Sequence, residues 1–333
     1  MARRLSPLQI IALAAVTAVF AALPFLLGNE YYVGVAVFVG INAIVAIGLN
    51  LLMGYAGQVS LGHAAFIAIG AYTAAILTTR TPVSPWLAML AAVALSSLVA
   101  AVIGLPALKL HGHYLAMATL GFGMIVNIVI IEWVAVTGGP SGLVDIPRLR
   151  LAGVALDTNK YYYLVWALVA VSLGLSFNLV NSRVGRALRA LHTSEVAAAT
   201  CGVDIARTKL QVFVLSAALA GLAGSLYAHY VQFVGPGHTF GFGFSIELVV
   251  MVVFGGLATI WGAIVGAGVV SVLGEYLRGA GDYDVVVFGL ILLLVLIFLP
   301  RGIVRGAGSF LPFRTVRPAH QGRSNRRRDA EAP

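Results

Sequence analysis

The sequence predicts an all-α integral membrane protein, with about ten transmembrane or re-entrant helices in two pseudo-symmetric halves. The mean hydropathy is +0.97 and only 10% of the 333 residues are charged, which excludes an ordinary soluble domain. Runs without Asp, Glu, Lys or Arg, such as 161–182 and 210–246, exceed the ~20 apolar residues that one span requires. Two glycine-rich stretches, at 54–72 and 254–270, indicate interrupted helices in the two halves.

The spans follow from the apolar runs in chain order. We expect them at 8–27, 32–53, 64–79, 86–108, 114–136, 161–180, 210–233, 246–261, 262–278 and 284–299. The runs at 64–79 and 246–261 are short and lie beside glycines, so either can be a re-entrant or broken helix, and the count stays between eight and ten. The first run is too long for the apolar part of a secretory signal and lacks a cleavage pattern, which predicts an uncleaved span.

Basic residues predict that both ends of the chain lie in the cytoplasm. Two arginines open the chain, eight follow Pro300, and five Lys or Arg lie at 183–209. This distribution fits the excess of positive charge on the cytoplasmic side of membrane proteins, and ten crossings return the chain to its starting side. We therefore expect one membrane domain over 1–303 and a basic cytoplasmic tail at 304–333 that is disordered.

The charged segment at 183–209 is the clearest candidate for contact with a partner. Leu188 and Leu191 recur at helical spacing while Arg186 lies at another angle, which predicts an amphipathic helix on the cytoplasmic surface. Its many alanines have small side chains, which allow a partner protein to approach the helix closely. The single cysteine, Cys201, lies in this segment and cannot form an internal disulfide.

Polar side chains lie inside the first glycine-rich stretch. Gln58, Ser60 and His63 fall between glycines at membrane depth, where they must face protein or water rather than lipid. Broken helices that expose polar groups at this depth are typical of a transport path. Close packing of helices through small residues is the alternative for both stretches, and it requires no ligand.

The other titratable residues predict neither a catalytic site nor a metal site. Three acids could lie near the membrane, namely Glu132, Glu247 and Glu275. The first and the last fall near span ends, where interfacial placement is expected, and the role of the middle one stays open. His111 and His113 have no third ligand nearby, which favours a cytoplasmic turn. The glycines at 138–142 have no following lysine and no preceding strand, so they are not a phosphate loop, and we expect no ATP hydrolysis by this chain.

Five blocks of sequence carry a resemblance to a known family. They are Asn50 with GYAGQVSLGHAAFIAIGAY, GHYLAMATLGFG at 112–123, TGGPSGL at 137–143, GVDIARTKLQVFVLSAALAGLAGSLYAHY at the end of the charged segment, and SIELVVMVVFGGLATIWGAIVGA at 245–267. Together, over 35–303, they resemble the branched-chain amino acid ABC transporter permeases, most of all the LivM type. Five blocks in one order are far more specific than any single motif.

This resemblance implies a transport subunit of the bacterial inner membrane. The protein would be one of two permease subunits of an importer, with a second homologous permease, two cytoplasmic ATPases and a periplasmic amino-acid-binding protein as partners. ATP would be used by the ATPases, and this chain would bind no cofactor. The implied ATPase-docking residues are Arg186, Glu195, Ala197, Ala198 and Gly202, and the acid stands one position earlier than in other importers. Polar groups for a zwitterionic cargo would be Asn50, Gln58, Ser60 and His63.

Other functions stay open at this point. Permeases for urea or short amides, or for sugars or nucleosides, share the same features. A secondary amino-acid transporter or a channel would also show broken helices, but it has no need of the charged segment and is expected to carry a better-buried acid. A membrane enzyme would require paired acids or a metal cluster at mid-depth, and the sequence shows none. The sequence does not separate Leu, Ile or Val from other amino acids or amides as cargo.

Overall fold

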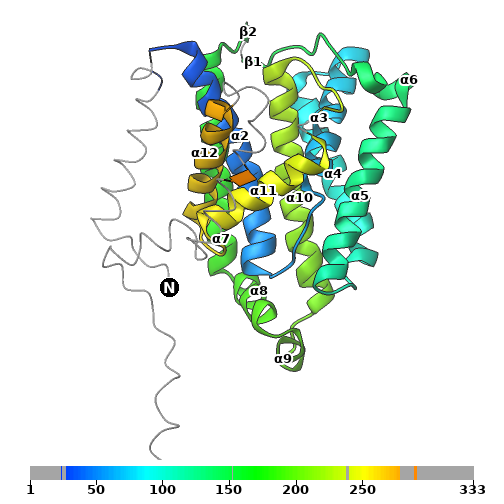
Figure 1. Cartoon of the computed structure of the whole chain (residues 1–333), viewed down its shortest axis with the longest axis vertical. Coiled ribbons are helices and arrows are strands. Elements are labelled where there is room, and N and C mark those ends of the chain that lie inside the picture. Colours follow the sequence, from blue (N-terminus) through cyan, green and yellow to red (C-terminus); the bar gives the residue numbers. More distant parts are fainter. Residues whose placement is uncertain (1–23, 25–27, 152, 238–239, 278–288, 291–333) are drawn as a thin grey trace, which may run out of the picture.

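Long apolar helices make up most of the structure (Figure 1). The computed structural model describes residues 24, 28–151, 153–237, 240–277 and 289–290. The long helices are α2 (Glu30–Asn50), α3 (His63–Arg80), α4 (Pro85–Ala107), α5 (His113–Glu132), α7 (Thr158–Asn181), α10 (Ile205–Val231), α11 (Phe242–Gly255) and α12 (Ile260–Leu277). In this described part, six are long and apolar enough to cross a membrane: α2 with its extension to Tyr55, α4, α5, α7, α10 and α12. The spans predicted at 8–27 and 284–299, and the tail at 304–333, lie outside the described residues.

The predicted spans agree with the observed helices except at two places. α10 begins at Ile205 rather than at 210, because the carboxylate of Asp204 caps it and accepts a hydrogen bond from the N–H of Arg207 at 3.0 Å. The boundary predicted at 261 is wrong, because α11 ends at Gly255 and the chain turns at 256–259 before α12. With 14 residues, α11 is about 21 Å long, which is less than a membrane core of ~30 Å. α11 is therefore a broken half-span, as expected for one of the short runs.

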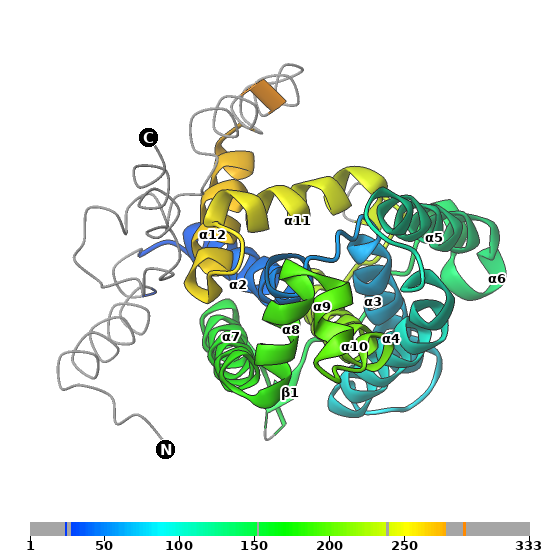
Figure 2. The ribbon, with the colours of Figure 1, turned by 90° about the horizontal axis from the view of Figure 1, so that it is seen from below.

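α2 and α10 occupy the centre of the bundle. From Val39 to the end of α2 every residue except Asn42 is buried. α3 and α4 pack against α10, while α7, α11 and α12 pack against α2. Figure 2 shows α11 lying across one side of the bundle, between α5 and α12. Only three apolar side chains of α5 are buried, Leu115, Phe122 and Ile130, as on a helix that faces lipid, so the core lies between α2, α3 and α10.

Glycines allow the central helices to approach closely. A Cβ atom at Gly70 of α3 would overlap the backbone of Gly221 on α10, and one at Gly224 would overlap the backbone of α3. In the second half, Gly255 and Gly262 bring α11 and α12 together in the same way. Close packing through small residues thus accounts for these members of both glycine-rich stretches, the alternative that needs no ligand.

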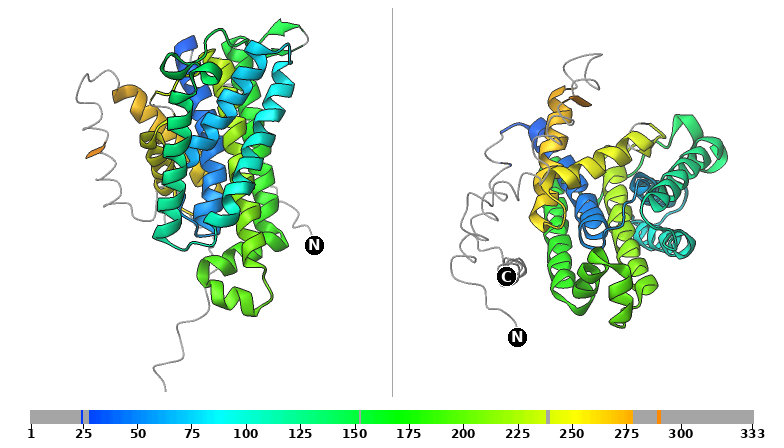
Figure 3. Two further views of the ribbon diagram at one scale, coloured as in Figure 1. Left: turned by 90° about the vertical axis from the view of Figure 1, so that its right-hand side faces the viewer. Right: turned by 60° about the horizontal axis from the view of Figure 1, so that its bottom comes forward.

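The two ends of the bundle carry different short elements. At one end lie α6 (Val134–Thr137), the 3-10 turn η2 (Gly139–Ser141) and the antiparallel hairpin of β1 (Arg150–Leu151) and β2 (Val154–Ala155). At the other end, α8 (Arg183–Thr193) and α9 (Glu195–Thr200) project beyond the long helices (Figures 1 and 3). The charged segment is therefore the part of the described chain that a partner can most easily reach at that end.

Candidate functional site

The charged segment begins with the amphipathic helix that the sequence predicts. Ser182 caps α8 by accepting hydrogen bonds from two N–H groups of the first turn, at 3.1 and 3.4 Å. Leu188 and Leu191 are buried against the bundle, while Arg186 is exposed. The apolar stripe of α8 therefore faces the protein and its charged side faces outward.

The charged segment is two helices rather than one. Ser194 has an extended backbone that ends α8, and its hydroxyl caps α9 by accepting a hydrogen bond from the N–H of Ala197 at 3.3 Å. At the other end of α9, Gly202 has φ of +79°, a conformation that is common for a glycine that ends a helix. The N–H of Val203 donates to the carbonyl of Ala198 at 3.1 Å and closes this end. Both ends of α9 are thus fixed by local hydrogen bonds.

Glu195, the first residue of α9, is bound within the chain. Its Oε1 lies 2.6 Å from Nζ of Lys209 on α10, and its Oε2 lies 3.0 Å from Nε2 of His111 in the turn before α5. Burial by itself would raise the pKa of Glu195, but the hydrogen bond and charge of Lys209, with those of His111, outweigh it and hold this pKa below its usual 4.5. Glu195 therefore ties α9 to α10 and to the α4–α5 turn.

The other predicted docking residues divide into exposed and buried ones. Arg186, Ala197 and Gly202 are exposed, as a contact with a partner requires. Ala198 is only 2% exposed and packs inside the chain. Val196, which the sequence did not single out, is 77% exposed at the projecting end of the protein. The outward apolar surface of α9 is therefore made by Val196, Ala197 and Ala199.

Asn50 joins the two interrupted segments. It ends α2, just before the π-helical turn η1 (Leu51–Tyr55), and is only 2% exposed. Its Nδ2 donates to the carbonyl of Thr259 at 2.7 Å, and its Oδ1 accepts from the N–H of Ala258 at 3.0 Å. These backbone groups lie in the turn between α11 and α12, where the series of backbone hydrogen bonds within a helix is interrupted. One side chain therefore supplies hydrogen bonds that the interruption leaves unmade.

The other polar candidates are buried, and two of them, Ser60 and His63, are hydrogen-bonded to each other. Ser60 Oγ lies 2.9 Å from His63 Nδ1, and His63 Nε2 lies 2.7 Å from Ser216 Oγ on α10. Gln58 Nε2 donates to the carbonyl of Ala56 at 3.2 Å. The candidates for a path thus fall in two groups, with Asn50 at the α11–α12 turn and the other three in the turn before α3 and at its contact with α10.

α8 contacts the first interrupted segment directly. Gly57, in the turn between η1 and α3, has φ of +68°. A Cβ atom there would lie 2.9 Å from Nδ1 of His192 on α8. The projecting helices and the turn that carries Gln58 therefore move against one another only if this contact changes.

The three acids that could lie near the membrane are all found at or near helix ends. Glu132 is exposed at the end of α5, and Glu275, near the end of α12, accepts a hydrogen bond from the hydroxyl of Tyr31 at 2.7 Å. Both occupy helix ends, as predicted. Glu247 is half-buried near the start of α11. Within the described ranges, no three His, Cys, Asp or Glu side chains are grouped so as to hold a metal ion.

Sequence reasoning missed Lys209 and His111 as structural partners of Glu195. Lys209 was assigned to the charged surface segment, but it is 1% exposed in the second turn of α10. Asp204 is the signal that locates Lys209, because an Asp three residues before Arg207 can cap a helix that starts at Ile205, and this start places Lys209 inside the helix. Nothing local in the sequence indicates that His111, 84 residues earlier than Glu195, approaches the same carboxylate.

Comparisons with known proteins agree on one family. The model of the family described as branched-chain amino acid transport system, permease component, matches residues 31–296. The chain is 32% identical to the high-affinity branched-chain amino acid transport permease LivM of Salmonella typhimurium, over 88% of this chain and 74% of that protein. It is 32% identical to LivM of Escherichia coli, over 82% and 69%, and 30% identical to BraD of Pseudomonas aeruginosa, over 79% and 91%. No solved structure matches the chain.

Proposed function

The chain belongs to the branched-chain amino acid transport permease family, and from this premise we propose that it carries branched-chain amino acids into the cytoplasm as one subunit of an ABC importer. It works with a second homologous permease, two cytoplasmic ATPases and an extracytoplasmic binding protein, and ATP is used by the ATPases alone. The projecting pair α8–α9 is the observation that most supports this assembly, since a carrier that works alone has no use for it (Figure 3).

α8 and α9 are the docking site for an ATPase subunit. Val196 and Ala197 present a small apolar surface at the tip, and Arg186 adds a charge on α8. Interfaces of this kind combine an apolar centre with a polar rim. Glu195 and Gly202 act indirectly, because the ion pairs of the first and the turn at the second fix the direction of α9.

The same contacts suit transmission of ATPase movement to the path. α8 touches the turn at Gly57 through His192, and the segment before that turn holds the α11–α12 turn through Asn50. Moving α8–α9 therefore acts on both interrupted segments. Importers require two pore conformations and a rigid element through which ATPase closure selects one. In this proposal, Gln58, Ser60 and His63 exchange their internal hydrogen bonds for contacts with the amino acid as the path opens.

Replacing Asn50 by leucine should impair transport strongly while the protein still assembles. The change leaves the N–H of Ala258 and the carbonyl of Thr259 without partners, at a cost of about 1–3 kcal/mol for each buried group. We expect ATP-driven uptake to fall at least tenfold, measured with radiolabelled leucine in proteoliposomes that hold the assembled transporter. Asn42→Leu is the matched control, since Asn42 lies on the same helix and bonds Ser271 of α12 at 2.9 Å, away from the interruption. Equal uptake by both variants would contradict a role for the turn.

The proposed orientation places α8–α9 in the cytoplasm and the β1–β2 hairpin outside, with both chain termini cytoplasmic. Cys201 is exposed beside α9 and should not react with a membrane-impermeant thiol reagent in intact cells, but should react after permeabilisation. Val154→Cys, in a Cys201→Ser background, should react in intact cells because Val154 is exposed in the hairpin. Labelling of Cys201 from outside would reverse the orientation and remove α8–α9 from the ATPases.

Reconstituted uptake tests the function itself. Proteoliposomes with both permeases, both ATPases and the binding protein should accumulate leucine, isoleucine or valine only when ATP is present on the cytoplasmic side. Uptake that continues without the ATPases would identify a secondary carrier. Uptake of urea or short amides in preference to these amino acids would assign the chain to the amide permeases.

A further inference from the structure

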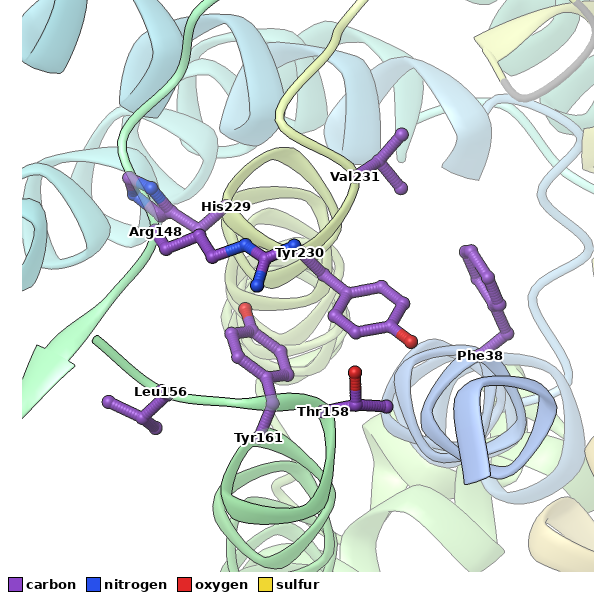
Figure 4. A pocket seen from close by; sticks show the side chains of 8 residues that line it. All are labelled: Phe38, Arg148, Leu156, Thr158, Tyr161, His229, Tyr230 and Val231. Atoms are coloured by element: carbon purple, nitrogen blue, oxygen red, sulfur yellow. The ribbon is translucent and has the colours of Figure 1, made fainter. Parts of the chain in front are cut away.

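A pocket of about 290 Å³ lies at the end of the bundle opposite α8 and α9. It is formed by the start of α7, the end of α10, the loop before β1 and one side of α2 (Figure 4). Its lining combines a guanidinium, hydroxyl groups, an imidazole and apolar side chains. Ligand pockets usually measure about 300–1,000 Å³, so this one suits a molecule no larger than a single amino acid.

Arg148 supplies a positive charge to this outer pocket. Its Nε donates to Oε1 of Gln232 at 3.1 Å, and Figure 4 shows its guanidinium beside Tyr161 and Tyr230. Gln232 also donates from Nε2 to the carbonyl of Ile146 at 3.2 Å, so the loop that carries Arg148 is fastened to the end of α10. No ion pair among the described residues involves Arg148. Its remaining N–H groups are therefore suited to a carboxylate, which guanidinium binds in a bidentate manner.

His229 supplies a buried acceptor to the same pocket. The side chain is 0% exposed, and its Nδ1 lies 2.8 Å from the carbonyl oxygen of Pro147. Because a carbonyl only accepts, Nδ1 carries the proton, and Nε2 of the neutral ring presents a lone pair. Nε2 has no hydrogen-bond partner in the described part of the chain. Buried polar atoms without partners are uncommon, so we expect this nitrogen to accept a hydrogen bond from a ligand, for example from an ammonium group.

Apolar side chains complete the pocket. Phe38 of α2 and Val231 at the end of α10 lie on the side away from the loop that carries Arg148 (Figure 4). Leu156, just before α7, lies on the side of that loop, where its N–H donates to the carbonyl of Leu149 at 2.9 Å. Such surfaces bind an aliphatic side chain by excluding water from it.

We propose that this pocket binds a free aliphatic α-amino acid at the extracytoplasmic end of the permease. Arg148 holds the carboxylate, His229 accepts a hydrogen bond from the ammonium group, and Phe38 and Leu156 contact the side chain. The inference rests on the proposed function, in which the pocket receives the amino acid that the binding protein releases. A ligand without a carboxylate would leave Arg148 unpaired, and one without an ammonium group would leave Nε2 of His229 without a donor, so the site selects zwitterions.

Leucine binding to the permease alone tests this proposal. The full chain is placed in nanodiscs of phosphatidylcholine, which excludes anionic headgroups as competitors for Arg148, and binding of radiolabelled leucine is measured. We expect leucine to bind, and both leucinamide and 4-methylpentanoate to compete at least tenfold more weakly, because the first lacks the carboxylate and the second the ammonium group. Arg148→Gln should weaken leucine binding at least tenfold and abolish the preference for leucine over leucinamide.

Arg150→Gln is the matched control, because Arg150 is an exposed arginine two residues away that does not line the pocket. It should bind leucine as the wild type does. Absence of leucine binding to the wild type, equal binding by the two variants, or equal competition by leucinamide and leucine would each overturn the pocket proposal. If the assembled wild-type transporter still takes up leucine in those cases, the proposed function survives. If it takes up none, the function fails as well.

Discussion

Replacing Glu195 by glutamine should destabilise the corner where α9, α10 and the α4–α5 turn meet by about 3 kcal/mol. The change leaves the ammonium group of Lys209, which is 1% exposed, without its carboxylate partner. Removing one member of a buried ion pair costs roughly 3–5 kcal/mol, and the lower end applies because Glu195 is partly exposed. Hydrogen exchange at 195–209 should accelerate markedly, and the thermal unfolding temperature in detergent should fall.

The double variant Glu195→Gln/Lys209→Met should recover much of this loss, because no buried charge then remains unpaired. Glu132→Gln is the control, since Glu132 is an exposed acid at the other end of the bundle and should have no effect. The pKa of Glu195 is lowered in the folded state, so its contribution is complete above pH 4.5 and is lost as the pH falls through the folded pKa. Unchanged exchange in Glu195→Gln, or a loss of the Glu195 contribution between pH 7 and 5, would contradict the ion-pair account.

Val196→Glu should abolish ATPase association and ATP-driven uptake together without disturbing the fold. Val196 is exposed at the tip of α9, so a carboxylate there is tolerated in the isolated chain. In the proposed complex it would be buried against the ATPase without a partner, at a cost of at least ~2 kcal/mol, or about a thirtyfold loss of affinity. Co-purification of the ATPase with the permease, together with leucine uptake, measures both effects.

Val154→Glu is the control for this test, because it places the same charge on an exposed valine at the opposite end of the protein. Its assembly and uptake should equal those of the wild type. Ala198→Glu is a less specific probe, since Ala198 is buried and the new side chain would disrupt α9 itself. Normal ATPase binding by Val196→Glu would show that α9 is not at the interface and would leave docking to α8 alone.

Hydropathy alone located the described spans to within a few residues. Backbone groups in lipid must be paired within their own helix, so a long apolar run has few other structures to adopt. α8 was also predictable from a local pattern, because its apolar residues recur with the helical period and are buried. The positive φ of Gly202 follows from its place after a helix. Short interruptions were predicted less accurately, because the cap at Asp204 and the turn at 256–259 depend on a few specific hydrogen bonds and not on a periodic pattern.

The sequence by itself determined that this is a polytopic helical membrane protein with an amphipathic segment at one end, since both properties follow from local periodicity and apolar length. Only the tertiary structure decided which polar groups meet. Asn50 is hydrogen-bonded to a turn more than 200 residues later in the chain. Glu195 forms ion pairs with Lys209 and His111, which belong to two other elements. Such pairs depend on how closely glycines let distant helices approach, and on which partner satisfies a buried polar group at lowest cost. No local pattern in the chain contains that information.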